Sequence, residues 1–181
     1  MDTYKLKITP LGTKATRLLY IKAGQKLSQR KIARTLNVSP TSVAKIIPLL
    51  EKRKIIRITR SKEMNLNLVE LNRENQKVIH LKKVENQRLI YESNLLELLK
   101  EKYPGCTIIL FGSYAKGEDT INSDIDLTII GSNKKNINLE RYEKFLEREI
   151  RINNYKTFKE INKELKENLC NGIVLSGGIE L

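Results

Sequence analysis

The sequence GSYAKG at residues 112–117, followed after a short loop by SDIDL at residues 123–127, decides the fold of the C-terminal part of this chain. The run before it, residues 107–111, is apolar and largely β-branched, so we expect a buried strand that turns sharply into a helix at Gly112. Backbone N–H groups at a helix N-terminus are free to bind phosphate, and glycine lets phosphate approach closely. The pattern therefore predicts a phosphate site where the strand becomes a helix.

The second run adds carboxylates to this expected site. Asp124 and Asp126 lie two residues apart in a predicted strand over residues 124–130, so both side chains point to one face, about 7 Å apart. Two carboxylates so placed can share divalent cations that bridge the phosphates of a nucleotide. We therefore expect Asp124 and Asp126 to be metal ligands and catalytic residues. The residues expected to contact the nucleotide are Gly112, Ser113, Lys116, Gly117 and Ser123.

The complete run GSYAKGEDTINSDIDL, residues 112–127, resembles the nucleotidyltransferase superfamily typified by DNA polymerase beta, and most closely its minimal nucleotidyltransferase branch. The family pattern is Gly-Ser-x-Ala-Arg-Gly, a loop, and Ser-Asp-x-Asp-Leu. This chain departs from it at Lys116, which keeps the charge of Arg but loses its bidentate fork. The alternative for these residues is a hairpin with polar turns.

The resemblance covers about residues 100–177 and implies a small mixed α/β domain. It implies an enzyme that binds a nucleoside triphosphate, ATP, together with Mg2+ or Mn2+. The enzyme would transfer the nucleoside monophosphate, here AMP, to a hydroxyl. Related minimal nucleotidyltransferases are antitoxins that transfer AMP to a partner of the HEPN ribonuclease type. A protein hydroxyl is therefore a candidate acceptor, and a HEPN-type toxin a candidate partner.

A third carboxylate completes the site in active members of the superfamily, and here its expected position is occupied by a cation. The predicted strand at residues 149–153 places Glu149, Arg151 and Asn153 on one face, and the family's acid falls near Arg151. Glu149 is the candidate third catalytic residue, and Asn153 is a possible neutral ligand. Two functions stay open: a complete transferase, and a transcriptional regulator whose nucleotide-binding domain is catalytically impaired.

The positive charge of the chain is concentrated in its first third. Residues 1–60 contain 15 Lys or Arg against Asp2 and Glu51, a net charge of 15 − 2 = +13, which equals the net charge of the whole chain. Such a basic block points to a phosphate backbone or another anionic surface. No apolar stretch approaches the roughly 20 residues of a membrane span, so we expect a soluble cytoplasmic protein without membrane contact.

The basic block follows the pattern helix, helix, turn, helix, hairpin. A first helix ends near Gly24, a second at residues 29–36 is capped by Ser28, and a third starts after Ser39 with Pro40 at its first position. Two apolar runs then predict a hairpin. This part resembles the winged helix-turn-helix family, which implies binding to double-stranded DNA through the third helix.

The third helix carries the base-contact candidates, and its surroundings carry the phosphate contacts. Pro48 removes a backbone donor within this helix and is expected to bend or shorten it. The alternative is a solvated basic face on a protein-docking module. The residues expected to contact DNA are Thr41, Ser42 and Lys45 for the bases, and Arg30, Lys31, Arg34, Lys54, Arg57 and Arg60 for phosphates.

These observations predict an α+β protein of two domains. We place a winged helix-turn-helix at residues 1–72, a linker helix at 73–103 and a minimal nucleotidyltransferase domain at 104–181. The linker lacks glycine and proline up to residue 102, which favours one long helix or two in succession. Its apolar stripe pairs with a second copy in a homodimer or packs across its own domain.

Three smaller expectations concern the rest of the chain. His80 has no second histidine nearby and is expected on the surface of the linker helix. Cys106 and Cys170 are too few and too far apart for a zinc site, and we expect two buried thiols. Residues 158–169 have helical spacing and are expected to form one helix.

Overall fold

The structure is a computed structural model that describes residues 8–61 and 66–179. The chain divides into two compact units, Met1–Val78 and Ile79–Leu181. The division falls inside helix α4, Gln76–Glu92, so the two units share one continuous helix. None of the helices in the described residues is long and apolar enough to cross a membrane.

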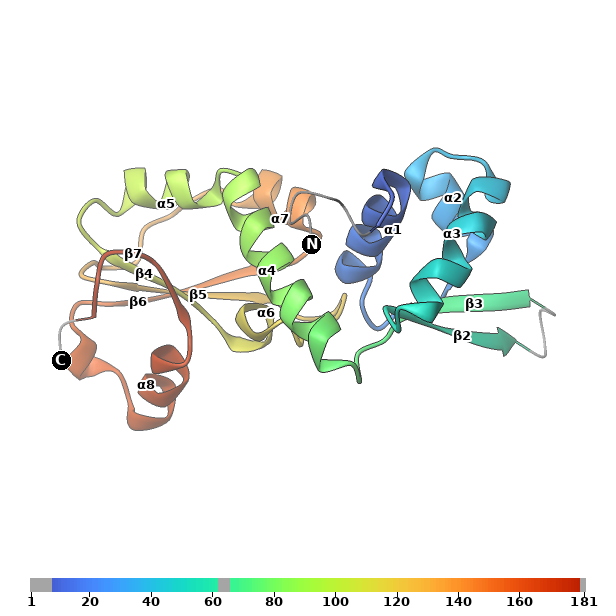
Figure 1. Ribbon diagram of the computed structural model, residues 1–181. Helices are drawn as coiled ribbons and strands as arrows, with labels where there is room; N and C mark the ends of the chain where they lie inside the picture. The colour runs from blue at the N-terminus through green and yellow to red at the C-terminus, as the bar shows by residue number, and fades with distance from the viewer. Residues whose placement is uncertain (1–7, 62–65, 180–181) are drawn as a thin grey trace, which may run out of the picture. The chain divides into compact units, whose positions relative to one another are not determined.

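The first unit has the topology of a winged helix. Its strands form a three-stranded antiparallel sheet in the order β1-β3-β2, and β2 and β3 form a hairpin (Figure 1). Apolar side chains from all three helices and from the sheet make one core. The elements are α1 Pro10–Ile21, β1 Leu27–Ser28, α2 Gln29–Leu36, α3 Pro40–Lys52, β2 Ile56–Ser61 and β3 Leu66–Leu71.

Both predicted helix caps in this unit are confirmed. The Ser28 hydroxyl accepts a hydrogen bond from the backbone N–H of Lys31 at 3.2 Å, and the Ser39 hydroxyl accepts one from Ser42 at 3.1 Å. The expected effect of Pro48 on helix length is wrong, since α3 continues to Lys52. Pro48 lies on the exposed side of α3, where a carbonyl without its helical donor can bind water instead.

The second unit is built on a four-stranded mixed sheet in the order β6-β5-β4-β7. The pair β5 and β6 is parallel, and the other pairs are antiparallel. All of β4 is buried, and in Figure 1 α5 and α8 lie on opposite faces of the sheet. The elements after α4 are α5 Leu95–Lys102, β4 Thr107–Phe111, α6 Gly112–Lys116, β5 Ile125–Ile130, α7 Glu140–Leu146, β6 Ile150–Tyr155, α8 Lys163–Cys170 and β7 Ile173–Ser176.

The predicted linker is two successive helices. Asn94, in the left-handed region with φ +61°, separates α4 from α5. His80 is on the helix surface, as expected, and Cys106 is buried.

Two expectations for the C-terminal part are wrong. A 3-10 turn at Phe158–Glu160 replaces the start of the predicted helix, and α8 begins only after Asn162, whose side chain caps it. Apolar residues from both segments still pack on one face of β4, so the hydrophobic spacing reflects burial without a continuous helix. Cys170 is exposed, because it is the last residue of α8 and follows the buried Leu169.

Candidate nucleotide site and basic surface

Gly112 connects the buried strand β4 to helix α6 at the centre of the candidate site. Its φ is +74°, a conformation that strains other residues. A Cβ atom at this position would collide with the carboxylate of Asp126, the residue paired with Phe111 across the sheet. Glycine therefore suits the backbone turn, and any larger residue would also displace the Asp126 carboxylate. No side chain among the described residues caps the first turn of α6.

Asp124 and Asp126 lie on either side of Ile125, the first residue of β5, whose apolar side chain is buried. The pKa of Asp126 is raised, chiefly because the carboxyl is partly buried and also because Asp124 is nearby, while Arg151 opposes the shift. The carboxylates of Asp124 and Asp126 thus repel each other at the point where the sequence predicted that they would share a cation.

The predicted position of the third acid is occupied by Arg151. The parallel register of β5 and β6 places Arg151 directly opposite Asp126. Its guanidinium lies 2.9 Å from Asp124 Oδ2 through Nη1 and 3.4 Å from Glu149 Oε1 through Nε. Glu149 and Asp124 raise the pKa of Arg151, so this cation stays charged at any working pH. Glu149, Arg151 and Asn153 are exposed, as expected for one face of the strand.

The donor set suits one divalent cation and does not suit a three-carboxylate site. Among residues 8–61 and 66–179, no three His, Cys, Asp or Glu side chains are grouped so as to hold a metal ion. Asp124 and Asp126 provide two carboxylates, and Mg2+ commonly binds to one or two carboxylates plus phosphate oxygens of the substrate. Glu149 points its carboxylate at Arg151 instead.

The remaining predicted nucleotide contacts lie close to this centre. Ser113 is half-buried in the first turn of α6, and Lys116 is exposed at its end. Gly117, with φ +78°, is buried against α4, and a Cβ there would lie 2.7 Å from Lys83 N. The Ser123 hydroxyl accepts a hydrogen bond from Thr120 N at 3.0 Å and so supports the loop before Asp124.

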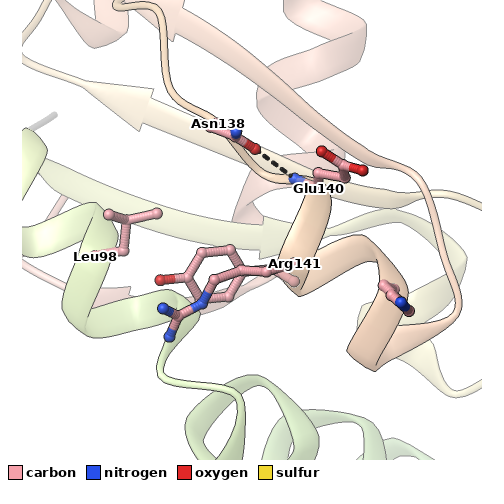
Figure 2. Close-up of a pocket in the computed structure, with 6 residues that line it drawn as sticks. Leu98, Asn138, Glu140 and Arg141 are labelled. Carbon is pink, nitrogen blue, oxygen red and sulfur yellow. Dashed lines mark hydrogen bonds between the residues drawn. The ribbon is translucent and has the colours of Figure 1, made fainter.

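A shallow, open depression of about 410 Å3 lies beside Asp124. It is lined by the loop before β5 and by the segment from α7 to β6, including Glu143 and Glu149. A second depression, of about 510 Å3, contains none of the predicted site residues. Figure 2 shows Leu98 of α5, Asn138 before α7, and Glu140 and Arg141 in its first turn among the residues that line it.

The residues expected to contact DNA all belong to the first unit. Most are exposed on α2, on the first turns of α3 and on the hairpin, while Ser42 is half-buried and shares a 2.8 Å hydrogen bond with Ser39. Arg57 is engaged by Glu74 through both terminal nitrogens, which raises the pKa of Arg57 and lowers that of Glu74. Its charge is therefore partly neutralised before any DNA arrives.

A buried charged cluster next to the site escaped prediction. Lys82, Asn86, Asp119 and Arg148 each have at most 5% of their surface exposed. The side chains of Lys82, Asn86 and Arg148 all donate hydrogen bonds to the carboxylate of Asp119. On α4 the buried Lys82 and Asn86 interrupt an otherwise apolar stripe with a spacing of one helical turn. Two polar residues one turn apart within an apolar stripe were the sequence signal for a buried polar cluster.

Residues 92–176 match the family described as "Nucleotidyltransferase domain". The match begins at the end of α4, ends with β7 and contains both motifs. The chain is 54% identical over 33 residues to the "Putative protein adenylyltransferase MJ1379" of Methanocaldococcus jannaschii, a match that covers 18% of this chain and 33% of that protein. The chain thus spans about a third of that curated relative.

Solved structures of repressor-type proteins also align with part of the chain. Lactococcus lactis ZitR in complex with DNA covers 57% of this chain and 67% of its own at 21% identity, with a TM-score of 0.40. The adhesin competence repressor AdcR of Streptococcus pyogenes covers 56% and 71% at 20% identity, with a TM-score of 0.43. Both scores lie below 0.5, so these likenesses carry no statement about function. The second unit thus carries the match to a known family, a nucleotidyltransferase domain over residues 92–176.

Proposed function

We propose that the second unit transfers a nucleoside monophosphate from a metal-bound nucleoside triphosphate, with ATP as the donor, to a hydroxyl group. The observation that carries this proposal is the stacking of the Asp126 carboxylate over Gly112 at the start of α6, beside Asp124. Carboxylates for a cation and a glycine turn for phosphate then meet at one point. The nucleotidyltransferase match over residues 92–176 supports it.

In this proposal Asp124 and Asp126 hold one Mg2+ or Mn2+, and Ser113 with the start of α6 holds the phosphates. The cation would neutralise charge on the phosphates during transfer. The acceptor oxygen bonds to the α-phosphorus, the bond from that phosphorus to the β-phosphate oxygen breaks, and pyrophosphate leaves. Glu149, whose side chain is 63% exposed, is the candidate to receive the acceptor's proton.

The acceptor that we propose is a hydroxyl on a protein. The partial similarity to the "Putative protein adenylyltransferase MJ1379" of Methanocaldococcus jannaschii supports this choice. A HEPN-type toxin stays one candidate acceptor, on the sequence resemblance alone. The depression beside Asp124, rimmed by Glu143 and Glu149, offers an acceptor a route to the site.

The test compares ATP labelled at the α-phosphate with ATP labelled at the γ-phosphate, each with Mg2+ or Mn2+ and a cell extract. Transfer of AMP leaves label on protein only from the α-labelled nucleotide. Asp126→Asn should abolish labelling, while Glu140→Gln, an exposed carboxylate on α7, should not change it. Label from the γ-phosphate that is lost in Asp126→Asn, with none from the α-phosphate, would contradict the proposal.

The ion pair of Arg151 with Asp124 favours a second candidate, a regulator that binds nucleotide without turnover. The guanidinium supplies a positive charge where active members place a carboxylate, so the site could hold the triphosphate without activating an acceptor. Binding of Mg-ATP by calorimetry, with no label transferred to any protein, would select this candidate over the enzyme.

We also propose that the first unit binds double-stranded DNA through α3. The exposed cations of α2 and α3 and the +13 net charge of residues 1–60 support it. Six phosphate contacts would give a slope of about −5 in log K against log salt concentration. Lys45→Glu with Arg34→Glu should abolish binding to duplex, and Lys100→Glu on α5 should not. If the double variant bound duplex with unchanged affinity, the first unit would instead be a protein-docking module with a solvated basic face.

A further inference from the structure

The loop that joins α6 to β5 contains a carboxylate removed from solvent. Asp119 is 1% exposed, and its two oxygens accept hydrogen bonds from three side chains. Lys82 and Asn86 of α4 donate to Oδ1, the latter at 2.7 Å, and Arg148 Nη2 donates to Oδ2 at 3.2 Å. Because a buried charge is costly without partners, these groups must assemble together as the unit folds.

The residues of this cluster come from three segments, two of which supply the ion pair of the candidate site. The loop with Asp119 leads directly to Asp124, and the turn with Arg148 leads directly to Arg151 in β6. The carboxylate of Asp119 therefore ties together the two segments from which Asp124 and Arg151 meet. Backbone pairing between Ile125 N and Glu149 O, at 2.8 Å, continues the same connection into the sheet.

Helix α4 also contacts the segment that precedes the loop, at Tyr114 of α6. Asn86 Nδ2 donates to the carbonyl oxygen of Tyr114 at 2.9 Å, and the Tyr114 hydroxyl lies 3.5 Å from the carbonyl oxygen of Asn86. A Cβ at Gly117 would lie 2.5 Å from the carbonyl oxygen of Ile79, so only glycine lets the loop lie this close to the helix. The segment from Tyr114 to Asp119 is thus attached to α4 at both ends.

We propose that Asp119 is a positioning residue for the nucleotide site. Held by Lys82, Asn86 and Arg148, it sets the separation of Asp124 and Arg151, and through it α4 controls the geometry in which the phosphates are bound. This inference rests on the proposed nucleotide-binding function of the site. Asp119 itself touches neither Asp124 nor Arg151 in the contacts described, so its effect passes through the backbone of the two segments.

Lys82→Met is the most informative variant. It removes one of the two cations and leaves Asp119 paired with Arg148, so no buried charge loses its partner. Asp119→Asn would instead remove the carboxylate that both buried cations contact and is expected to unfold the unit. Lys83→Met, on the next residue of α4, is the matched control because the Lys83 side chain makes none of these hydrogen bonds. Asn86→Leu is a second test that leaves all three charges in place.

The first measurement is amide hydrogen exchange in the full-length chain. Lys82→Met and Asn86→Leu should each speed exchange about tenfold or more at residues 118–124 and 148–151, with β4 unchanged. Lys83→Met should leave both segments as in the wild type. If Lys82→Met unfolds the whole unit, the exchange rates of Asn86→Leu become the test of the positioning role. Exchange unchanged in both segments of a folded variant would overturn the inference.

The second measurement is catalytic. With Mg-ATP as the probe, we expect kcat for label transfer to fall about 10- to 100-fold in Lys82→Met while KM for ATP changes little, since a displaced side chain lowers reactivity more than binding. A rise in KM for ATP with kcat unchanged would overturn the positioning role. If the wild type binds no nucleotide, the proposed function fails, and hydrogen exchange still decides whether Asp119 positions the two segments.

Discussion

The guanidinium of Arg151 lies 2.9 Å from the carboxylate of Asp124, at the strand position directly opposite Asp126. This contact places a positive charge beside two residues whose carboxylates otherwise repel. In the absence of nucleotide, Arg151 thus performs part of the charge compensation that a cation provides. Under the proposed function, Arg151 would also compete with that cation for Asp124.

Replacing Arg151 by Asp should strengthen metal binding. The change removes the competing guanidinium and adds a third carboxylate opposite Asp126. We expect Mn2+ affinity to rise about tenfold, equivalent to about 1.4 kcal/mol, measured by electron paramagnetic resonance titration. Arg151→Met should give a smaller increase, because it removes the competitor without adding a ligand. Weaker Mn2+ binding in Arg151→Asp would show that the guanidinium is needed to hold the site together.

Gly112→Ala should damage the site more than Gly105→Ala does. Both glycines have φ +74°, so both variants carry the same backbone strain of about 1–2 kcal/mol. A Cβ at Gly105 meets no atom within 4 Å, whereas one at Gly112 meets the Asp126 carboxylate. The difference between the two variants in urea unfolding, expected at about 1–3 kcal/mol, isolates that collision. Equal losses would mean that Asp126 moves aside freely.

Much of the second unit was predictable because its elements obey local rules. The apolar and largely β-branched run of residues 107–111 favours a buried strand, and the glycine after it marks the turn into α6. Alternation along β6 correctly placed Glu149, Arg151 and Asn153 on one face. The family pattern placed its third acid near Arg151, and the sheet sets Arg151 directly opposite Asp126.

The unpredicted features depend on contacts between distant segments. Lys82 and Asp119 are separated by α5, β4 and α6 in the chain, and neither residue alone differs from a solvated surface charge. Only the fold makes them a buried pair. In the same way, the sequence of residues 158–169 has helical spacing because its apolar residues share one buried face, although the backbone reaches that face through a turn and a shorter helix.

Glu74→Gln should strengthen DNA binding by releasing Arg57. In the wild type Glu74 holds both terminal nitrogens of Arg57, so this cation has little to offer a phosphate. One additional phosphate contact makes the slope of log K against log salt more negative by about 0.9. Arg57→Met should hardly change the slope in the wild type but should cancel the gain in the Glu74→Gln background. An equal loss in both backgrounds would show that Arg57 leaves Glu74 when DNA binds.

Val84→Glu should convert a dimer into a monomer. One face of α4 is buried through Ile79, Leu89 and Ile90, while Leu81 and Val84, with 48% and 63% exposed, stand on another face. Tyr91, 45% exposed, continues that stripe. A helix that has already buried one apolar face in its own unit leaves this second stripe for another copy of the chain, as in a coiled coil.

Light scattering coupled to size-exclusion chromatography measures this change. We expect the mass of two chains for the wild type and of one chain for Val84→Glu. Phe145→Glu on α7, which alters an equally exposed apolar residue outside the stripe, is the control and should remain dimeric. A monomeric wild type would leave the α4 stripe without a self-association role. DNA binding would then have to rely on one winged helix at a single half-site, and its salt slope would be half that of a dimer contacting two half-sites.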